Sequence, residues 1–300
     1  RCTGTAVNAA TEAVAAGADI ILGPLDGEAA AAVGLAVSGA GLNVMTFSNN
    51  TAIAGGNVFL LGQTFQDSAT RLARYAQSQG KSRAVIVHAR NVAGEAGRAA
   101  ISQALSQSGV LLAGTASYEN TLPGISAATS QIASTVTVND ADALFLTSNT
   151  AGALPILADL LPEAGLGPDE VQYIGLARWD LDSRLYTNRG VQGGWFAMPD
   201  RARSTAFTSR YGAAYGAAPH PLAATAYDGI AVIAALWSEG GSNPLNGAAI
   251  TRSSGFQGAA GIVRFRANGT NERGLAIGSI QNGEVITIDP APQGFSSLGF

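Results

Sequence analysis

The chain has 300 residues, of which 47% are hydrophobic and only 13% are charged, and its formal net charge is −4. This length can bury an ample core and favours two domains over one. The mild acidic balance, without a basic stretch between aromatic residues, argues against a nucleic-acid partner. Cys2 is the only cysteine, so no internal disulfide can form, nothing supports a metal site, and no apolar run reaches the ~20 residues that span a bilayer.

The first part of the chain predicts helices and short apolar strands. Val7 and Val14, at a heptad spacing in an alanine-rich background, predict a helix that stops at Gly17. The elements expected in this part are a helix at 6–16, a strand at 19–23, a helix at 28–37, and strands at 43–47 and 58–61.

The middle of the chain repeats one pattern of strands and helices. Strands that alternate with helices of ten to fifteen residues imply βαβ units, and hence parallel sheets with helices on both faces. The expected helices are at 67–79, 94–107, 125–136 and 151–161, and the expected strands are at 84–88, 110–116, 143–147 and 171–175.

After residue 175 the pattern changes. The sequence predicts a strand at 193–197, helices at 202–215 and 222–237, and then strands at 261–266, 275–280 and 284–288. Asn-Gly between apolar runs is a strong hairpin signal, and it occurs at Asn268-Gly269 and at Asn282-Gly283. The expected fold class is therefore α/β, with doubly wound parallel sheets and an antiparallel C-terminal hairpin.

The ends of the early strands are the first candidate for a binding site. In an open parallel sheet, ligands bind beyond the carboxyl ends of the strands. The strand at 19–23 runs into a Gly-Pro turn, and the strand at 43–47 runs into Ser48, Asn49 and Asn50. We therefore expect the segments 22–27 and 48–51 to line a site.

Several strings, in this order and spacing, resemble the periplasmic ligand-binding proteins of the Leu/Ile/Val-binding type over essentially the whole chain. They are ADIILGPL, LNVMTFSNN, DSATRLARYAQSQGKSRAVIVHA, GGWFAMPD and FTSRYGAAYGAAPHPLAATAYDGIAVIAAL. The GPL string followed by LNV and an Asn-rich loop is especially similar to the penicillin-binding-protein activator lipoproteins, which share this fold.

The resemblance implies the type I periplasmic binding fold, in which two lobes are joined by three crossovers and a solute binds in the cleft between them. We expect the crossovers near Gln66, near Met198-Pro199 and near Glu272. Lobe one then combines 1–66 with 199–272, and lobe two combines 67–198 with 273–300. Members of this family begin with a β-α-β segment ahead of the helix at 6–16, so this first unit is expected to be missing from the sequence.

The implied function is non-enzymatic binding of a small polar or anionic, amino-acid-like solute for an ABC-type importer, in the periplasm, with a lipid anchor on the precursor as a variant. The alternative is an activator that regulates peptidoglycan synthesis through contacts with a cell-wall synthase. No cofactor is implied. The sequence has no Gly-x-Ser-x-Gly, no Gly-rich phosphate loop and no His-Glu-x-x-His, so it offers no catalytic motif.

Two departures from the family's amino-acid clamp bear on the solute. The position of a carboxylate-binding hydroxyl falls at Gly27, and the position of an ammonium-binding acid falls at or next to Ala177. The remaining polar and aromatic candidates for ligand contact are Ser48, Asn49, Asn50, Gln63, Thr64, Asn91, Thr150, Arg178, Trp179 and Tyr227.

Each of these candidates also has a structural interpretation. Ser48 and Asn50 can simply shape a turn, Arg178 can be a surface cation instead of a carboxylate fork, and Trp179 is favoured as core or hinge packing. Tyr227 is favoured as a residue at the edge of the core. We predict a neutral or anionic solute held by Ser48 and Asn50 on one lobe and by Arg178 on the other, with weak or no binding of leucine, isoleucine and valine.

Overall fold

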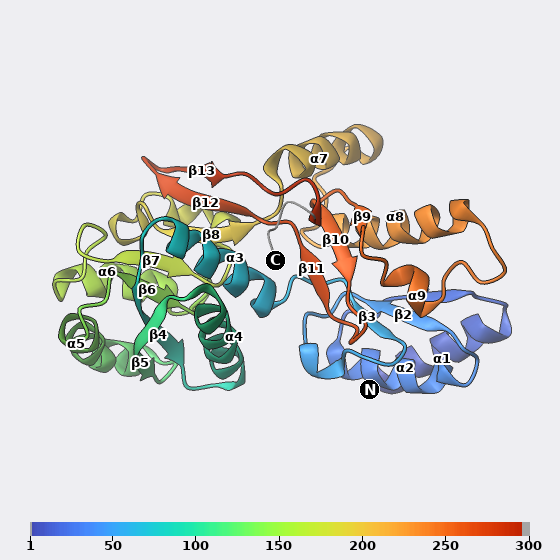
Figure 1. The fold of residues 1–300 in the computed structure, drawn as a ribbon, viewed down its shortest axis with the longest axis horizontal. Coiled ribbons are helices and arrows are strands. Elements are labelled where there is room, and N and C mark those ends of the chain that lie inside the picture. Colours follow the sequence, from blue (N-terminus) through green and yellow to red (C-terminus); the bar gives the residue numbers. More distant parts are fainter. Residues whose placement is uncertain (1, 296–300) are drawn as a thin grey trace. The chain divides into compact units, whose positions relative to one another are not determined.

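The computed structural model describes residues 2–295, and these residues form two compact units (Figure 1). Unit 1 comprises residues 2–64, 199–274 and 291–295, and unit 2 comprises residues 65–198 and 275–290. Each unit has its own sheet and its own hydrophobic core, as expected of an independent domain.

Unit 1 contains a three-stranded parallel sheet in the order β1-β2-β3. Its strands are β1 (Ile20–Leu22), β2 (Asn43–Thr46) and β3 (Val58–Leu60). The helices that precede and connect the strands are α1 (Cys2–Ala15), α2 (Gly27–Ser38) and the short η1 (Thr51–Ile53). The expected alternation of this segment is confirmed.

Both faces of this sheet are covered, because successive strand residues point to opposite sides. Val44 and Val58 pack with α1 and α2 in one cluster. Their neighbours Met45 and Phe59 pack on the other face, in a cluster most of whose other buried members lie between residues 232 and 265. The remaining helices of unit 1 are α7 (Arg201–Tyr215), α8 (Ala223–Glu239) and α9 (Gly247–Ile250), of which α8 and α9 contribute to this cluster.

A small antiparallel sheet completes unit 1. Its order is β11-β10-β9, with β9 (Phe256–Gln257), β10 (Ile262–Phe265) and β11 (Asn271–Arg273). The Asn268-Gly269 turn lies where it was expected, but it joins β10 to β11 and not to the strand expected at 275–280. No strand was expected at β9 or β11, because strands of two or three residues carry too few side chains to show a period.

Unit 2 contains a seven-stranded sheet in the order β13-β12-β8-β7-β6-β4-β5. Strands β4 to β8 are parallel to their neighbours, and β12 and β13 add an antiparallel edge. The strands are β4 (Arg83–Ala89), β5 (Leu111–Tyr118), β6 (Ala143–Leu146), β7 (Gln172–Gly175), β8 (Trp195–Met198), β12 (Ala276–Gln281) and β13 (Glu284–Asp289).

The helices of unit 2 lie on both faces of this sheet. Ile86, Phe145 and Ile174 pack with the first two helices on one face, and the alternate residues Val85 and Leu144 are buried on the other. The helices are α3 (Phe65–Ser78), α4 (Val92–Ser108), α5 (Leu122–Val138) and α6 (Leu154–Glu163), followed by η2 (Trp179–Leu181), η3 (Ser183–Leu185) and η4 (Arg189–Val191). The expected doubly wound α/β fold is confirmed.

The second expected hairpin joins β12 to β13. Asn282 and Gly283 both have positive φ, at 53° and 80°, which is the conformation that a type I′ turn requires at its two central residues. The flanking pair Gln281 and Glu284 is in register. The antiparallel C-terminal hairpin is therefore confirmed.

The chain passes between the units at 64/65, 198/199, 274/275 and 290/291. We expected three crossovers, near Gln66, Met198-Pro199 and Glu272, and placed the whole segment 273–300 in lobe two. The structure instead assigns residues 291–295 to unit 1, and residues 296–300 lie outside the described part.

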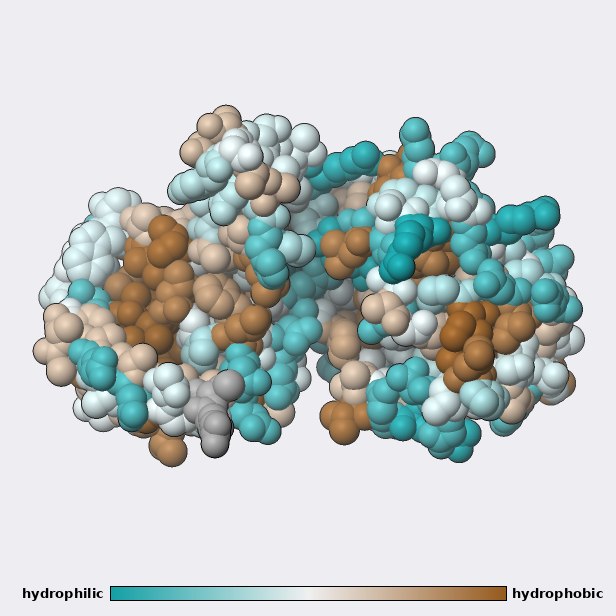
Figure 2. All heavy atoms as spheres, turned by 180° about the vertical axis from the view of Figure 1, so that it is seen from behind, coloured by the Kyte–Doolittle hydropathy of each residue, from teal (hydrophilic) through white to brown (hydrophobic). Residues whose placement is uncertain are grey.

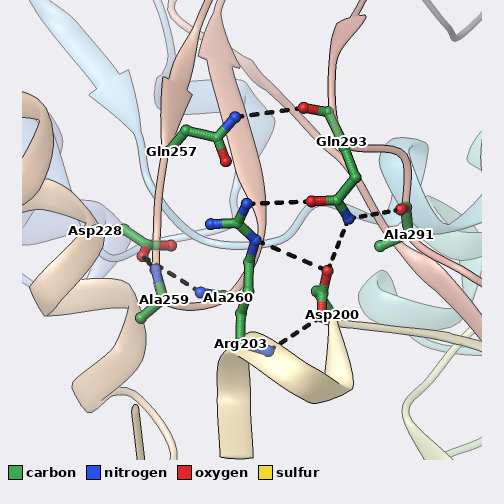
Figure 3. A network of polar contacts seen from close by, with 8 residues as sticks. All are labelled: Asp200, Arg203, Asp228, Gln257, Ala259, Ala260, Ala291 and Gln293. Carbon is green, nitrogen blue, oxygen red and sulfur yellow. Dashed lines mark hydrogen bonds and ion pairs between the residues drawn. The ribbon is translucent and has the colours of Figure 1, made fainter. Parts of the chain in front are cut away.

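The contacts of Gln293 explain why the chain returns to unit 1. Its Nε2 donates to Asp200 Oδ2 at 3.0 Å, and its Oε1 accepts from Arg203 Nη2 at 3.1 Å (Figure 3). Both partners lie at the start of α7, where Asp200 accepts the Arg203 backbone N–H at 3.1 Å and caps the helix. These contacts join residues about ninety positions apart, so no local pattern predicts them.

Asp200 makes the stability of unit 1 depend on pH. Burial alone would raise the pKa of this carboxyl, but hydrogen bonds from the Arg203 backbone, the Gln293 side chain and the Ala202 backbone outweigh it and lower the pKa below 3.8. A lowered pKa in the folded state means that ionised Asp200 stabilises the fold above about pH 4 and that this contribution is lost as the pH falls through the folded value.

We therefore expect Asp200→Asn to unfold more easily than the wild type at pH 7. The difference in the free energy of unfolding should become smaller as the pH is lowered from 7 to 3. Asparagine retains an oxygen for the helix cap but loses the charge that the surrounding donors favour. Urea unfolding of the wild type and the variant across this range measures the difference. A deficit that stays constant with pH would contradict the assignment.

Candidate functional site

In unit 1 the carboxyl ends of β1, β2 and β3 meet at one edge of the sheet. The strands are parallel and in register, with Leu22 beside Met45 and Thr46 beside Leu60. The loops that leave this edge are 23–26, 47–50 and 61–64. They contain Ser48, Asn49, Asn50, Gln63 and Thr64, so the structure brings these five candidates to a common edge.

Ser48 and Asn50 do form a local turn. Ser48 Oγ accepts the Asn50 N–H at 3.1 Å, and Asn50 Oδ1 accepts the Ala52 N–H at 3.1 Å and so caps η1. In both bonds the side chain uses an oxygen as acceptor. The hydroxyl proton of Ser48 and the amide protons of Asn50 are therefore able to donate to a ligand.

The first residue of α2 faces this pair. A Cβ built on Gly27 would lie 3.2 Å from Ser48 Oγ and 3.4 Å from Asn50 Nδ2. Asp26 caps the helix by accepting the Ala29 N–H at 2.9 Å. The close approach leaves little room for a side chain at position 27, which gives a physical reason for glycine where the family resemblance places a hydroxyl.

This arrangement favours a negative group. The N-terminus of a helix carries unsatisfied N–H groups and the positive end of the helix dipole. At α2 these backbone donors lie beside the hydroxyl of Ser48 and the amide of Asn50. A set of donors at a helix N-terminus suits a carboxylate.

The other candidates of unit 1 are less well placed. Asn49 is exposed next to Ser48, and Gln63 is half-buried. Thr64 is only 2% exposed. Tyr227 lies on α8 and is 46% exposed, and its ring packs against Phe207 at 5.5 Å between centroids.

In unit 2 three candidates follow neighbouring parallel strands. Asn91 follows β4 and caps α4 by accepting the Gly94 N–H at 2.8 Å. Thr150 follows β6 and is half-buried, and Arg178 follows β7. Because β4, β6 and β7 are adjacent in the sheet, these residues also share a carboxyl edge.

Arg178 is already engaged by a carboxylate of its own chain. Its Nε donates to Asp180 Oδ1 at 3.0 Å, and its Nη2 donates to Asp180 Oδ2. This two-point pairing uses the fork that we expected to hold a solute. A solute carboxylate has to compete with Asp180 for the guanidinium.

Trp179 packs in the core. It is fully buried, and its ring lies 6.0 Å from that of Phe196. The neighbouring Arg178 turns outward and is partly exposed. The packing interpretation favoured by the sequence therefore describes Trp179.

Further polar groups, which the sequence did not single out, lie at the carboxyl edge of the unit 2 sheet. Tyr118 ends β5, and burial raises its pKa to about 12, an effect only partly offset by the hydroxyl of Ser148. Tyr118 is therefore neutral at physiological pH. A tyrosine at the end of a strand and a serine after β6 were visible in the sequence, but their burial was not.

The described residues carry neither a metal centre nor a membrane span. No group of three or more His, Cys, Asp and Glu side chains in the described part is arranged to hold a metal ion. No helix within residues 2–295 combines the length and hydropathy needed to cross a bilayer. On the face shown in Figure 2, hydrophobic residues gather in separate patches among polar ones.

Comparisons with known proteins agree with this architecture. A protein from Rhodospirillum rubrum assigned to branched-chain amino acid ABC transport superposes with a TM-score of 0.80 at 17% identity, covering 95% of this chain and 84% of that chain. An ABC transporter substrate-binding protein from Desulfitobacterium hafniense in complex with Leu gives 0.71 at 18% identity, with 95% and 85% covered.

A third structure carries a different solute. The solute-binding protein of an ABC transporter from R. palustris in complex with benzoate gives a TM-score of 0.64 at 17% identity, covering 97% of this chain and 83% of that chain. At such identities these likenesses show the fold alone. No curated protein matches the sequence.

The family is shown by a match to a protein-family sequence model. The model of the periplasmic binding proteins matches residues 3–284, which is nearly the whole chain. Family membership by sequence agrees with the type I periplasmic binding fold of the superposed structures. The chain therefore belongs to the periplasmic binding protein family.

Proposed function

We propose that this protein binds a small carboxylate-bearing solute in the periplasm and delivers it to an ABC-type importer, without catalysing a reaction. The observation that carries the proposal is the group of donors at the N-terminus of α2, where Gly27, Ser48 and Asn50 meet. Family membership supports the binding role, and the donor chemistry supports the class of solute.

We further propose that the solute lacks an ammonium group close to its carboxylate. Resemblance places the ammonium-binding acid at Ala177, which has no carboxylate, and the nearby Asp180 is held by Arg178. Tyr118 and Ser148 at the same edge of unit 2 are neutral. Benzoate, found in the R. palustris relative, has this chemistry, whereas leucine has the ammonium group.

We propose that the carboxyl edge of the sheet in each unit carries candidates for solute contact. Ser48 and Asn50 would hold the carboxylate from unit 1. In unit 2, Asn91, Thr150 and the Arg178–Asp180 pair are the candidates for polar contact with a solute. Because Asp180 partly neutralises Arg178, and Asp26 and Glu28 place carboxylates at the α2 N-terminus, we assign the contact with the solute's carboxylate to the hydrogen-bond donors of Ser48 and Asn50.

The first test is a thermal-shift screen of benzoate, short aliphatic carboxylates and amino acids. A solute at a hundredfold excess over its Kd should stabilise the protein by roughly 2.7 kcal/mol. We expect stabilisation by simple carboxylates and little or none by leucine, isoleucine and valine. Tighter binding of leucine than of any simple carboxylate would overturn the proposed solute class.

Calorimetry on Ser48→Ala tests the site. A hydrogen bond to a charged group contributes about 1.5–3 kcal/mol, so we expect a loss of affinity of roughly ten- to a hundredfold. Ser38→Ala is the matched control, because Ser38 lies at the opposite end of α2 and donates to the Leu35 carbonyl. Equal affinities for the two variants would remove Ser48 from the site.

The same screen separates the importer role from the activator role. If no solute stabilises the protein and a cell-wall synthase is retained on it in a pull-down, the activator interpretation replaces this one. A lipid anchor is compatible with either role and is tested separately, by labelling the full-length precursor with a fatty-acid analogue.

A further inference from the structure

The strand that leads to Ser48 ends in a buried polar residue. Thr46 is the last residue of β2, and its side chain is completely buried. Its hydroxyl donates to the Pro24 carbonyl oxygen at 2.6 Å and accepts the Ser48 N–H at 3.1 Å. Both capacities of the hydroxyl are thus used, and valine, which has the same shape, could supply neither.

These two bonds connect different loops of the candidate site. Pro24 belongs to the loop that connects β1 to α2, and α2 begins three residues after it. Ser48 belongs to the loop that follows β2. Two backbone bonds reinforce the link: Phe47 N–H donates to the Pro24 carbonyl at 3.1 Å, and Gly23 N–H donates to the Met45 carbonyl at 2.8 Å.

The link determines how Ser48 meets α2. The Ser48 hydroxyl is only 3.2 Å from where a Gly27 Cβ would lie, so a shift of either loop by a few tenths of an ångström changes the convergence of their donors. Thr46 is the side chain that bonds to both loops at once. It is buried beneath them and does not face a solute.

We propose that Thr46 is a positioning residue of the solute site, which sets the register between Ser48 and the α2 N-terminus. This inference rests on the proposed function. Without the Thr46 hydroxyl, the buried Ser48 N–H loses its acceptor and the Pro24 carbonyl keeps only the Phe47 N–H, so the loop at 47–50 shifts to recover a partner for Ser48. Affinity for a carboxylate then falls although no residue in contact with it has changed.

Three variants distinguish positioning from a general structural role. Thr46→Val removes the hydroxyl and keeps the shape, and Thr46→Ser keeps the hydroxyl. Thr129→Val is the matched control, because Thr129 is also buried and its Oγ1 donates to the Ile125 carbonyl at 3.1 Å within α5 of unit 2. All three are compared with the wild type.

Two measurements are made on each variant, well below its unfolding temperature. Amide hydrogen exchange at Ser48 and Phe47, followed by NMR without any solute, reports the link between the loops. Calorimetry with benzoate as the probe, or with the tightest carboxylate of the screen, reports the site. We expect Thr46→Val to accelerate exchange at Ser48 at least tenfold and to weaken binding about tenfold. Thr46→Ser and Thr129→Val should leave both close to wild type.

The outcomes separate this inference from the proposed function. Wild-type exchange at Ser48 in Thr46→Val overturns the positioning role, whether or not a solute binds. Faster exchange with unchanged affinity, while Ser48→Ala still weakens binding, overturns the inference and leaves the proposed function intact. If the wild type binds no carboxylate, the proposed function fails, and exchange alone then decides whether Thr46 positions Ser48.

Discussion

Replacing Arg273 with methionine should lower the free energy of unfolding of unit 1 by about 3–5 kcal/mol, because the substitution leaves a buried charge without its partner. The Arg273 side chain is 5% exposed and that of Asp228 is fully buried, and Nη1 lies 2.9 Å from Asp228 Oδ2. The same guanidinium donates to the Leu61 carbonyl from Nε at 3.2 Å and from Nη2 at 2.6 Å.

Asp228 makes a second hydrogen bond that the substitution does not remove. Its Oδ1 accepts the Ala259 N–H at 2.6 Å, as Figure 3 shows. The pair therefore joins α8, the loop before β10, and the end of β3. Loss of the guanidinium removes the β3 contact and leaves the buried Asp228 carboxyl without a cationic partner.

Hydrogen exchange, followed by mass spectrometry on peptides of unit 1, measures the stability of unit 1 separately from that of unit 2. Arg184→Met is the matched control, read on peptides of unit 2, because Arg184 pairs with Asp182 while 85% exposed, and it should leave the stability of unit 2 close to that of the wild type. The double variant Arg273→Met/Asp228→Asn should recover part of the loss, since no uncompensated charge remains. A double variant as unstable as the sum of its single changes would contradict this account.

The fold was largely predictable because its signals are local. Alternating apolar segments between 67 and 175 predicted the strands and helices of this part of unit 2. The two Asn-Gly pairs predicted the positions of two turns between antiparallel strands. The return of residues 291–295 to unit 1 was not predictable, since it depends on Gln293 meeting Asp200 across the chain. No periodic pattern carries such a contact.

The candidate site was predictable in its location and less so in its chemistry. The sequence placed Ser48 and Asn50 after the strand at 43–47, and the structure has them at the carboxyl edge of the unit 1 sheet, where the rule for parallel strands expects a ligand. The sequence could not show that Asp180 occupies the fork of Arg178, or that Thr46 bonds to two loops. Those facts depend on rotamers and on the distance between strand ends, which a sequence does not specify.

Replacing Gly94 with alanine should lower the stability of unit 2 by about 3 kcal/mol, the cost of forcing a methyl group into a closely packed contact. Gly94 lies in the first turn of α4, pressed against the end of β4. A Cβ there would overlap the Ala89 carbonyl oxygen and lie 2.9 Å from the carbonyl carbon. Both obstacles are backbone atoms, so no side-chain rotation can relieve the clash.

The matched control is Gly4→Ala in α1, where nothing lies within 4 Å of the new methyl group. There the substitution should stabilise the protein by about 0.5 kcal/mol, because alanine loses less backbone entropy on folding than glycine. Urea unfolding combined with hydrogen exchange in each unit measures both variants. A loss below about 1 kcal/mol in Gly94→Ala would mean that α4 can move off β4.

Movement of α4 would also affect the solute site. Asn91 lies between β4 and Gly94 and is held by the Gly94 N–H, so a helix that shifts to admit the methyl group carries Asn91 with it. We expect Gly94→Ala to weaken solute binding if Asn91 contacts the solute, and to leave affinity unchanged if Asn91 is only a helix cap. Asn91→Asp keeps the cap and adds a negative charge, so it should repel a carboxylate in the first case alone.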